Sequence, residues 1–401
     1  MLSALVARYR AFFALPDVVR LVAMAMVARM PLGTQGLGLL LHVRDLTGSF
    51  ATAGSTVGTY LAASAITAPV LGRIVDRIGP RIPLLVTGCV CPLALIAMLF
   101  ARPLQLSVPA IVAAAAIAGA FAPPITVLTR TMWRHRFEHD AEAGRTAFAV
   151  DAVLVELAFT LGPALIALVL ALSSPTAAYA LAVVFATIAV PVFVASPALK
   201  YWRHHPDATR HLLGPLTEPR LLTVYAATTL LTFCLGLLEV GYPGFATALG
   251  ITALSGVLLA VNSIGSAAGG LAYGGLHLEM PLERQLRRTL VLLALAILPQ
   301  VWVESPWLLA VLACLAGVFI APSLTAVTLL VTANAPPRYA TEAFTWSATC
   351  IVTGVGAGMA AGGYLVERFD AHAVFALSAL GALGAAVIAL ALRTSARSAS
   401  A

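Results

Sequence analysis

The sequence predicts an all-α membrane protein with twelve transmembrane helices in two six-helix bundles. Apolar residues make up 60% of the 401-residue chain, and charged residues make up only 10%. Soluble globular proteins carry about 25% charged residues. One membrane-spanning helix needs about 20 apolar residues, so the apolar content provides for about twelve such helices. Charges, prolines and glycines separate the apolar runs at intervals that suit a polytopic membrane protein.

This composition excludes several classes of protein. A soluble enzyme could not cover so much apolar surface with so few charges. A disordered or nucleic-acid-binding chain is excluded on the same ground, although the net charge is +7. The five cysteines lie within apolar runs and lack the spacing of a metal cluster or a disulfide framework. We therefore expect no metal, no cofactor and no nucleic-acid partner.

Apolar runs predict the spans in order, six in each half of the chain. The first six cover Leu21–His42, Ala53–Leu71, Ile82–Phe100, Val108–Leu128, Ala147–Leu172 and Ala177–Ala195. The second six cover Leu221–Val240, Leu254–Leu276, Leu286–Val303, Trp307–Thr332, Phe344–Val366 and Ala373–Leu392. The ninth span is short and the eighth is rich in glycine, so the ends of these two are the least defined.

The distribution of Arg and Lys predicts that both ends of the chain are cytoplasmic. With the N-terminus inside, 20 of the 24 basic residues fall in cytoplasmic segments. Arg44, Arg102 and Arg368 fall in outer loops, and Arg29 lies within a span. Basic residues of membrane proteins concentrate on the cytoplasmic side. The arginines near the N-terminus are not followed by a cleavage site, so we expect no removable signal peptide.

A hydrophilic stretch in the middle divides the chain into two equal halves. We predict an N-terminal bundle over 1–196, a cytoplasmic linker over 197–219, a C-terminal bundle over 220–393 and a disordered tail over 394–401. The linker contains histidines, but a solvated connection is favoured over a metal site because no ligand set with suitable spacing accompanies them.

Short matches recur between the halves at an offset of 198 residues. Ala118-Gly119, for example, matches Ala316-Gly317, and Pro124 matches Pro322. The constant offset indicates that the second half repeats the first. Two six-helix repeats are typical of secondary transporters, whose binding site lies between the halves near the middle of the membrane.

One loop motif identifies a family. Between the second and third spans the chain reads Gly72-Arg73-Ile74-Val75-Asp76-Arg77-Ile78-Gly79-Pro80-Arg81. This stretch resembles the cytoplasmic loop signature G-x-x-x-D-R-x-G-R-R of the major facilitator superfamily. Gly72 would let two helices approach closely, and Gly79-Pro80 would form the turn. Asp76 can face the positive end of a helix, and the arginines (Arg73, Arg77 and Arg81) can pair with carboxylates across the halves.

The resemblance implies that this loop fastens the cytoplasmic side when the central cavity opens outward. Candidate partners lie near Thr341 and Glu342 and near Arg130 and Arg134. The alternative is an ordinary basic loop whose charges only set the topology.

The fifth span contains Gly162-Pro163. This pair resembles the centre of a G-x-x-x-G-P-x-x-G-G stretch in proton-driven drug exporters of the same superfamily, although Ala158 replaces the first glycine. The resemblance implies a kink at the proline and close packing against the glycine-rich eighth span, at Gly265, Gly269 and Gly270. It favours export over import.

Four ionisable residues within spans are functional candidates, because each costs about 2.5–3.5 kcal/mol at the membrane centre. Arg29 either contacts an anionic substrate or forms a buried ion pair with Asp151 or Glu156. Glu156 is the deepest carboxylate of the first half and its best proton-carrier candidate. Asp151 is favoured as a cytoplasmic gate residue or a charge near a helix N-terminus.

Glu239 precedes Gly241 and Pro243, which we expect to break or bend the helix. Three alternatives remain for Glu239: an outer-gate residue, a second proton site, or a residue at a water-exposed helix end. Five aromatic side chains either line a cavity for a lipophilic substrate or serve helix packing. They are Tyr60, Phe148, Tyr225, Phe344 and Trp346.

The expected function is proton-coupled efflux of a small organic compound, drug-like or a metabolite, by a monomer in the bacterial inner membrane. An enzyme is not expected, because the chain has no nucleophile–base pair, and it has no ATP-binding sequence either. One alternative is a proton symporter that imports a sugar or organic acid. Another is a non-transporting membrane receptor, against which the gate motif argues.

Overall fold

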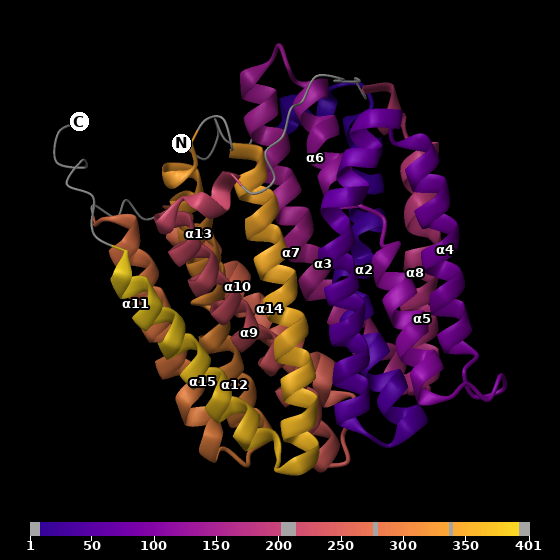
Figure 1. Ribbon diagram of the computed structural model, residues 1–401, viewed down its shortest axis with the longest axis vertical. Helices are drawn as coiled ribbons and strands as arrows, with labels where there is room; N and C mark the ends of the chain where they lie inside the picture. The colour runs from indigo at the N-terminus through magenta and orange to yellow at the C-terminus, as the bar shows by residue number, and fades with distance from the viewer. Residues whose placement is uncertain (1–8, 202–213, 276–279, 337–339, 393–401) are drawn as a thin grey trace.

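The computed structural model describes residues 9–201, 214–275, 280–336 and 340–392. These residues form long helices that lie side by side, and none of them forms a β-strand. Figure 1 shows the helices of the first half on one side of the bundle and those of the second half on the other.

The first half contains a short helical stretch over 9–14 and seven helices whose bounds lie wholly within the described residues. They are α2 (Val18–Thr47), α3 (Phe50–Ile78), α4 (Arg81–Leu99), α5 (Val108–Ala120), α6 (Ile125–Arg136), α7 (Ala141–Leu172) and α8 (Pro175–Ala195). The short 3-10 helices η1 (Pro197–Tyr201) and η2 (Gly214–Thr217) follow.

The second half repeats this order. Its elements are α9 (Pro219–Ala248), α10 (Leu254–Gly275), α11 (Leu282–Ile297), η3 (Leu298–Trp302), α12 (Pro306–Gly317), α13 (Ile320–Asn334), α14 (Ala340–Arg368), α15 (Ala371–Ile388) and η5 (Ala389–Ala391). The predicted tail over 394–401 and most of the predicted linker lie outside the described residues.

The fourth and tenth predicted spans are each interrupted, which the sequence analysis did not anticipate. In the first half α5 ends at Ala120 and α6 begins at Ile125. Pro123 and Pro124 lie between them, and proline has no N–H to continue the helical hydrogen bonds. The second half has the same interruption between α12 and α13, so the repeat extends to this irregular feature.

Ten helical stretches among the described residues are long and apolar enough to cross a membrane. The first and ninth predicted spans are not among them. α2 contains Arg20, Arg29 and Arg44, which lower its hydropathy, and α11 has only 16 residues before η3 continues it to Trp302. The buried polar residues of α2, including Arg29, contact other helices rather than lipid. Twelve spans and the side on which the termini lie remain predictions.

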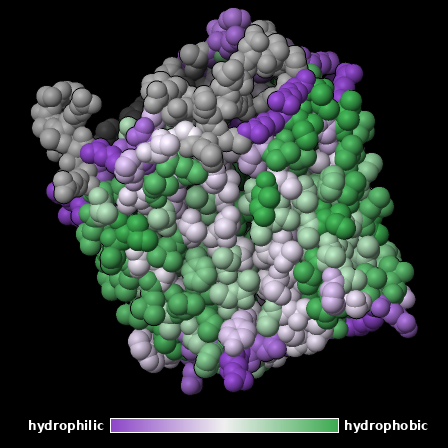
Figure 2. All heavy atoms as spheres, in the orientation of Figure 1, coloured by the Kyte–Doolittle hydropathy of each residue, from purple (hydrophilic) through white to green (hydrophobic). Residues whose placement is uncertain are grey.

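The surface divides into a hydrophobic band and two hydrophilic ends. Figure 2 shows hydrophobic side chains over both flanks and hydrophilic side chains at the top and bottom. One end, which we call the arginine-rich end, carries the α3–α4 turn and the end of α6, with Arg77, Arg81, Arg134 and Arg136. The other, which we call the opposite end, carries the start of α3 and the end of α14.

Two helix pairs make the most extensive contacts between the halves, α3 with α14 and α7 with α10, and α2 also touches α9. Gly54 and Gly58 of α3 lie directly against the backbone of α14, because a Cβ added to Gly54 would fall 2.4 Å from the carbonyl oxygen of Met359. Only glycine permits such an approach. These contacts lie in the first third of α3, near the opposite end.

Candidate functional site

A buried carboxylate in the first half binds two arginines. Arg29 of α2 is 1% exposed, and its Nη2 lies 2.5 Å from Oδ1 of Asp151 on α7. Arg130 of α6 reaches Oδ2 of the same carboxylate with its Nε at 3.2 Å. Asp151 therefore connects three helices through one ion-pair network. The expected ion-pair alternative for Arg29 is the one present in the structure, with Asp151 as the partner.

Asp151 lies in the third turn of α7, so it is not a charge of the helix N-terminus. The acidic residue of the first turn is Glu142, and Asp140 caps the helix by accepting a hydrogen bond from the Ala143 N–H. Arg130, which the sequence analysis considered as a partner for the α3–α4 loop, contacts Asp151 instead. The side chain of Glu156 lies outside the described residues, so its role as a proton carrier remains a prediction.

Glu239 lies within a continuous helix, so of the break or bend expected after it, the break is absent. α9 runs through Pro243 to Ala248, which places Glu239 nine residues before the helix end. Pro243 has no N–H, so the only helical hydrogen bond that it removes is the one to the carbonyl of Glu239, four residues earlier. A single missing bond bends a helix without ending it when neighbouring helices pack around it. Glu239 is thus not a helix-end carboxylate.

The Glu239 side chain is half-buried and faces the first half. A Cβ added to Gly36 of α2 would lie 3.6 Å from Oε2 of Glu239. Within the described part of the chain, this carboxylate has no hydrogen bond or ion pair. Glu239 and Asp151 therefore differ sharply: one carboxylate is unpaired between the halves, and the other is fully paired within the first half.

The α3–α4 loop forms the turn that its sequence predicts. Gly79 has a φ of +81° after the last residue of α3, and Pro80 precedes α4. A Cβ on Gly72 would meet nothing within 4 Å, so the expected close helix approach at Gly72 is not present. Arg77 and Arg81 are exposed, Arg73 is half-buried, and none of the three bonds to a described residue. The side chains of Asp76, Thr341 and Glu342 lie outside the described set.

The Gly162-Pro163 pair positions α7 against two helices. Gly162 packs on Gly33 of α2, where an added Cβ would lie 2.4 Å from the backbone carbon of Gly33. Pro163 leaves the carbonyl of Phe159 without its helical donor. The hydroxyl of Ser263 on α10 donates to this carbonyl at 3.2 Å, which forms a hydrogen bond between the halves.

The expected packing of α7 on α10 is present, but it involves a different glycine. Gly256 meets the carbonyl oxygen of Pro163, which an added Cβ would approach to 2.5 Å. Gly265 and Gly269 instead face the backbone at Cys314 and Val318, and Gly270 faces Ala321. Those three glycines therefore serve packing within the second half, because they lie on the face of α10 that is turned toward α12 and α13.

The five aromatic candidates have three kinds of environment. Tyr225 is 4% exposed, and its hydroxyl donates to the carbonyl of Ala343 at 3.0 Å, as the packing alternative requires. Tyr60 and Trp346 are half-buried against the main core. Phe148 and Phe344 are each 42% exposed and occupy equivalent positions near the starts of α7 and α14.

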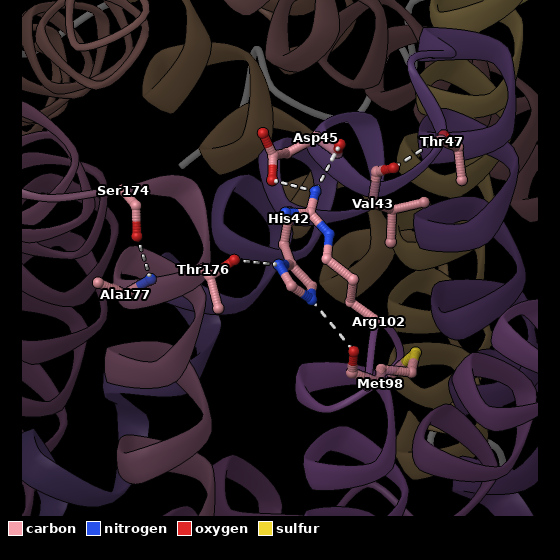
Figure 3. A network of polar contacts seen from close by, with 9 residues as sticks. All are labelled: His42, Val43, Asp45, Thr47, Met98, Arg102, Ser174, Thr176 and Ala177. Carbon is pink, nitrogen blue, oxygen red and sulfur yellow. Dashed lines mark hydrogen bonds and ion pairs between the residues drawn. The ribbon is translucent and has the colours of Figure 1, made fainter. Parts of the chain in front are cut away.

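Sequence reasoning missed a polar network around His42 in α2. The ring Nε2 lies 3.1 Å from the Met98 carbonyl oxygen, and Nδ1 lies 3.4 Å from the Thr176 hydroxyl. Figure 3 shows His42 between these partners from α4 and α8, beside the Asp45–Arg102 ion pair. A carbonyl only accepts, so Nε2 carries the proton in this arrangement. The network connects α2, α4 and α8. One partner of His42 is a backbone carbonyl, which any residue type provides, so the sequence does not indicate this contact.

Comparisons with known proteins agree with this geometry. The family model described as "Major Facilitator Superfamily" matches residues 21–303. A solved structure of a point mutant of the nucleoside transporter NupG is similar with a TM-score of 0.76 and 15% identity, over 93% of this chain and 98% of that one.

A second NupG structure gives a TM-score of 0.68 and 15% identity, over 94% of this chain and 99% of that one. At this identity the likeness extends to the fold alone. A search of curated proteins gives no match. The family model covers well over half of the chain, and the repeated helices and the α3–α4 loop agree with it. The chain belongs to the major facilitator superfamily, a family of membrane transporters.

Proposed function

We propose that this protein is a secondary transporter that works by alternating access and couples inward proton movement to export of a small organic compound. It acts as a monomer in the cytoplasmic membrane of a bacterium. Family membership supports transport. The observation that carries the proposed coupling is the Glu239 carboxylate, which is half-buried against Gly36 between the halves and has no partner among the described residues.

The distribution of contacts between the halves supports alternating access. The hydrogen bond from Ser263 and the close approach at Gly54 and Gly58 lie in the middle and toward the opposite end. At the arginine-rich end the loop arginines have no described partner, and Gly72 faces open space. If the arginine-rich end is cytoplasmic, as basic residues indicate, the contacts between the described residues of the two halves lie on the outer side.

Glu239 is a better proton carrier than Asp151 on physical grounds. Two guanidinium groups already bind the Asp151 carboxylate, so both of its oxygens are engaged in ion pairs within the first half. Glu239 has no such partner among the described residues, and a lone carboxylate is costly within a membrane span. Proton binding removes this cost and neutralises a charge that faces the other half. The protonation state of Glu239 would therefore bias how α9 packs against α2.

The direction of transport rests on the resemblance of Gly162-Pro163 to an exporter motif. The second candidate is proton-coupled import of a polar solute, and the similarity in fold to a nucleoside transporter favours it. Arg29 gives import of an anion little support, because its charge is already paired with Asp151 through Nη2, although its Nε and Nη1 have no hydrogen-bond partner among the described residues. A receptor that binds without transport is the candidate from another class.

The test is proton flux in proteoliposomes under an imposed pH gradient. Cationic, neutral and anionic organic compounds are added in turn, with nucleosides and sugars as a separate group. Export coupled to protons predicts that some organic compound moves against the direction of proton flow. Movement of a nucleoside or sugar together with protons would establish import instead. Saturable binding with no flux of any compound would support the receptor.

A further inference from the structure

A carboxylate from the second half caps a helix of the first half at the opposite end. Glu367 lies in the last turn of α14, and its Oε2 accepts two hydrogen bonds. The donors are the Ser49 hydroxyl, at 2.5 Å, and the Ala51 N–H, at 2.8 Å. Ser49 is the N-cap residue of α3 and also accepts from the Thr52 N–H. Glu367 thus completes the cap of a helix that belongs to the other half.

The electrostatics of this arrangement favour the contact. The first N–H groups of a helix have no partner within it and carry a partial positive charge. A carboxylate at this position gains charge-assisted hydrogen bonds. The other charged groups nearby are already engaged or aimed elsewhere: Asp45 pairs with Arg102, and Arg44 lies over the Phe50 ring. Glu367 is exposed, so its contribution is modest and depends on salt concentration.

The contact lies at the end of the close α3–α14 pair. An added Cβ on Gly363 would fall 2.2 Å from the Phe50 carbonyl oxygen, and Gly54 meets the backbone one turn further along. Separation of α3 from α14 at this end would therefore break both hydrogen bonds of Glu367 together with the backbone packing. The contact exists only while the opposite end is closed.

We propose that Glu367 is a positioning residue of the transport cycle, which holds the opposite end closed in the state described here. This inference rests on the proposed alternating-access function. Loss of the carboxylate shifts the equilibrium toward the state that is open at this end, by about three- to tenfold, the range of single helix-cap and helix-dipole contacts. Glu367→Gln retains an acceptor oxygen but loses the charge, so its shift is smaller than that of Glu367→Ala.

The experiment measures the distance between two spin labels at the opposite end in lipid nanodiscs. Noncanonical amino acids carry the labels at Gln105 and Glu304, which are exposed and lie in different halves, so the five native cysteines stay in place. The wild type is expected to show mainly a short distance. Glu367→Ala is expected to increase the population at a longer distance.

Asp370→Ala is the matched control. Asp370 caps α15 by accepting from the Ala373 N–H at 2.9 Å, which is the same chemistry within one half. This variant is expected to leave the distances unchanged. Gly54→Val is the positive control, because its side chain would overlap the Met359 carbonyl and force the helices apart.

The outcomes separate two failures. If Gly54→Val lengthens the distance and Glu367→Ala behaves like the wild type, Glu367 does not hold this end closed, and the proposed function is untouched. If neither variant ever shows a second distance, the halves do not move at this end, and alternating access itself is contradicted. An equal shift in Glu367→Ala and Asp370→Ala would also overturn the inference, because it would reflect loss of helix stability alone.

Discussion

The two ends of α3 differ in their relation to the other half of the molecule. At its start, Gly54 and Gly58 touch the α14 backbone, and Glu367 caps the helix across the interface. At its end, Gly72 faces open space, and Arg77 has no partner among the described side chains. Both ends carry small and polar residues suited to helix contact, but among the described residues only the start of α3 makes that contact. In the proposed alternating-access cycle, this difference corresponds to one closed end and one end whose contacts form in another state.

The largest expected effect on stability comes from the Arg29–Asp151 ion pair, which lies within the first half and does not join the two halves. Asp151→Ala leaves the buried Arg29 without its carboxylate, and breaking such a pair costs about 3–5 kcal/mol. We expect a clear loss of thermal stability in detergent, measured by the unfolding transition. Replacement of both residues by apolar ones, as in Arg29→Met with Asp151→Leu, should recover much of the lost thermal stability. A stable Asp151→Ala protein would show that this network is not structural.

Substitution of the α3 glycines sharpens the comparison of the two ends. Gly54→Val should disrupt packing at the opposite end by about 1–3 kcal/mol, the usual cost of overpacking. Gly72→Val should leave the structure described here unchanged, since its added atoms meet nothing within 4 Å. It should nevertheless slow transport, because in the proposed cycle two helices approach at Gly72 when the arginine-rich end closes. The measurements are label distances and substrate flux, and equal effects of both variants on the distances would contradict this account.

Ser263→Ala tests the hydrogen bond between α10 and the Phe159 carbonyl. Its loss is worth about 0.5–1.5 kcal/mol, so a shift of up to roughly tenfold away from the described state is expected. Ser323→Ala is the matched control, because the Ser323 hydroxyl bonds only the Phe319 carbonyl within its own half. Label distances at the opposite end provide the measurement, and indistinguishable variants would mean that the Ser263 bond does not contribute.

The smallest effect on stability is expected at the α3–α4 loop. Arg77→Gln and Arg81→Gln should change the free energy of unfolding by less than about 0.5 kcal/mol, because both side chains are exposed and substitutions of exposed residues usually have small effects. Flux should fall if these arginines pair when the arginine-rich end closes. Unfolding curves and flux on the same samples separate the two effects. Unchanged flux in both variants would support a loop that only sets topology.

The helices and the family could be predicted from the sequence because both depend on local patterns. Apolar runs mark the spans, and Gly79-Pro80 marks its turn without reference to the rest of the chain. A buried ion pair of Arg29 with a carboxylate was one of two expected alternatives, the other being contact with an anionic substrate, since a charge in a span requires compensation. The choice of Asp151 depends on how α2, α6 and α7 pack, which no local pattern reveals.

Other features could not be predicted because tertiary contacts decide them. α9 continues through Pro243 although proline usually ends or bends a helix, since its neighbours pack along its whole length. Gly256, rather than Gly265 or Gly269, contacts α7. This choice depends on which face of α10 is turned toward α7. Glu367 follows no motif, because its partners are a helix cap and a backbone N–H more than 300 positions away.

The central claim is that one end of the molecule closes as the other opens. It is tested most directly by label distances at both ends of the same protein. Gln105 and Glu304 report the opposite end, and Ile82 and Arg284, also exposed and in different halves, report the arginine-rich end. In Gly54→Val the first distance should lengthen while the second shortens. Lengthening at the opposite end with no change at the arginine-rich end would contradict alternating access.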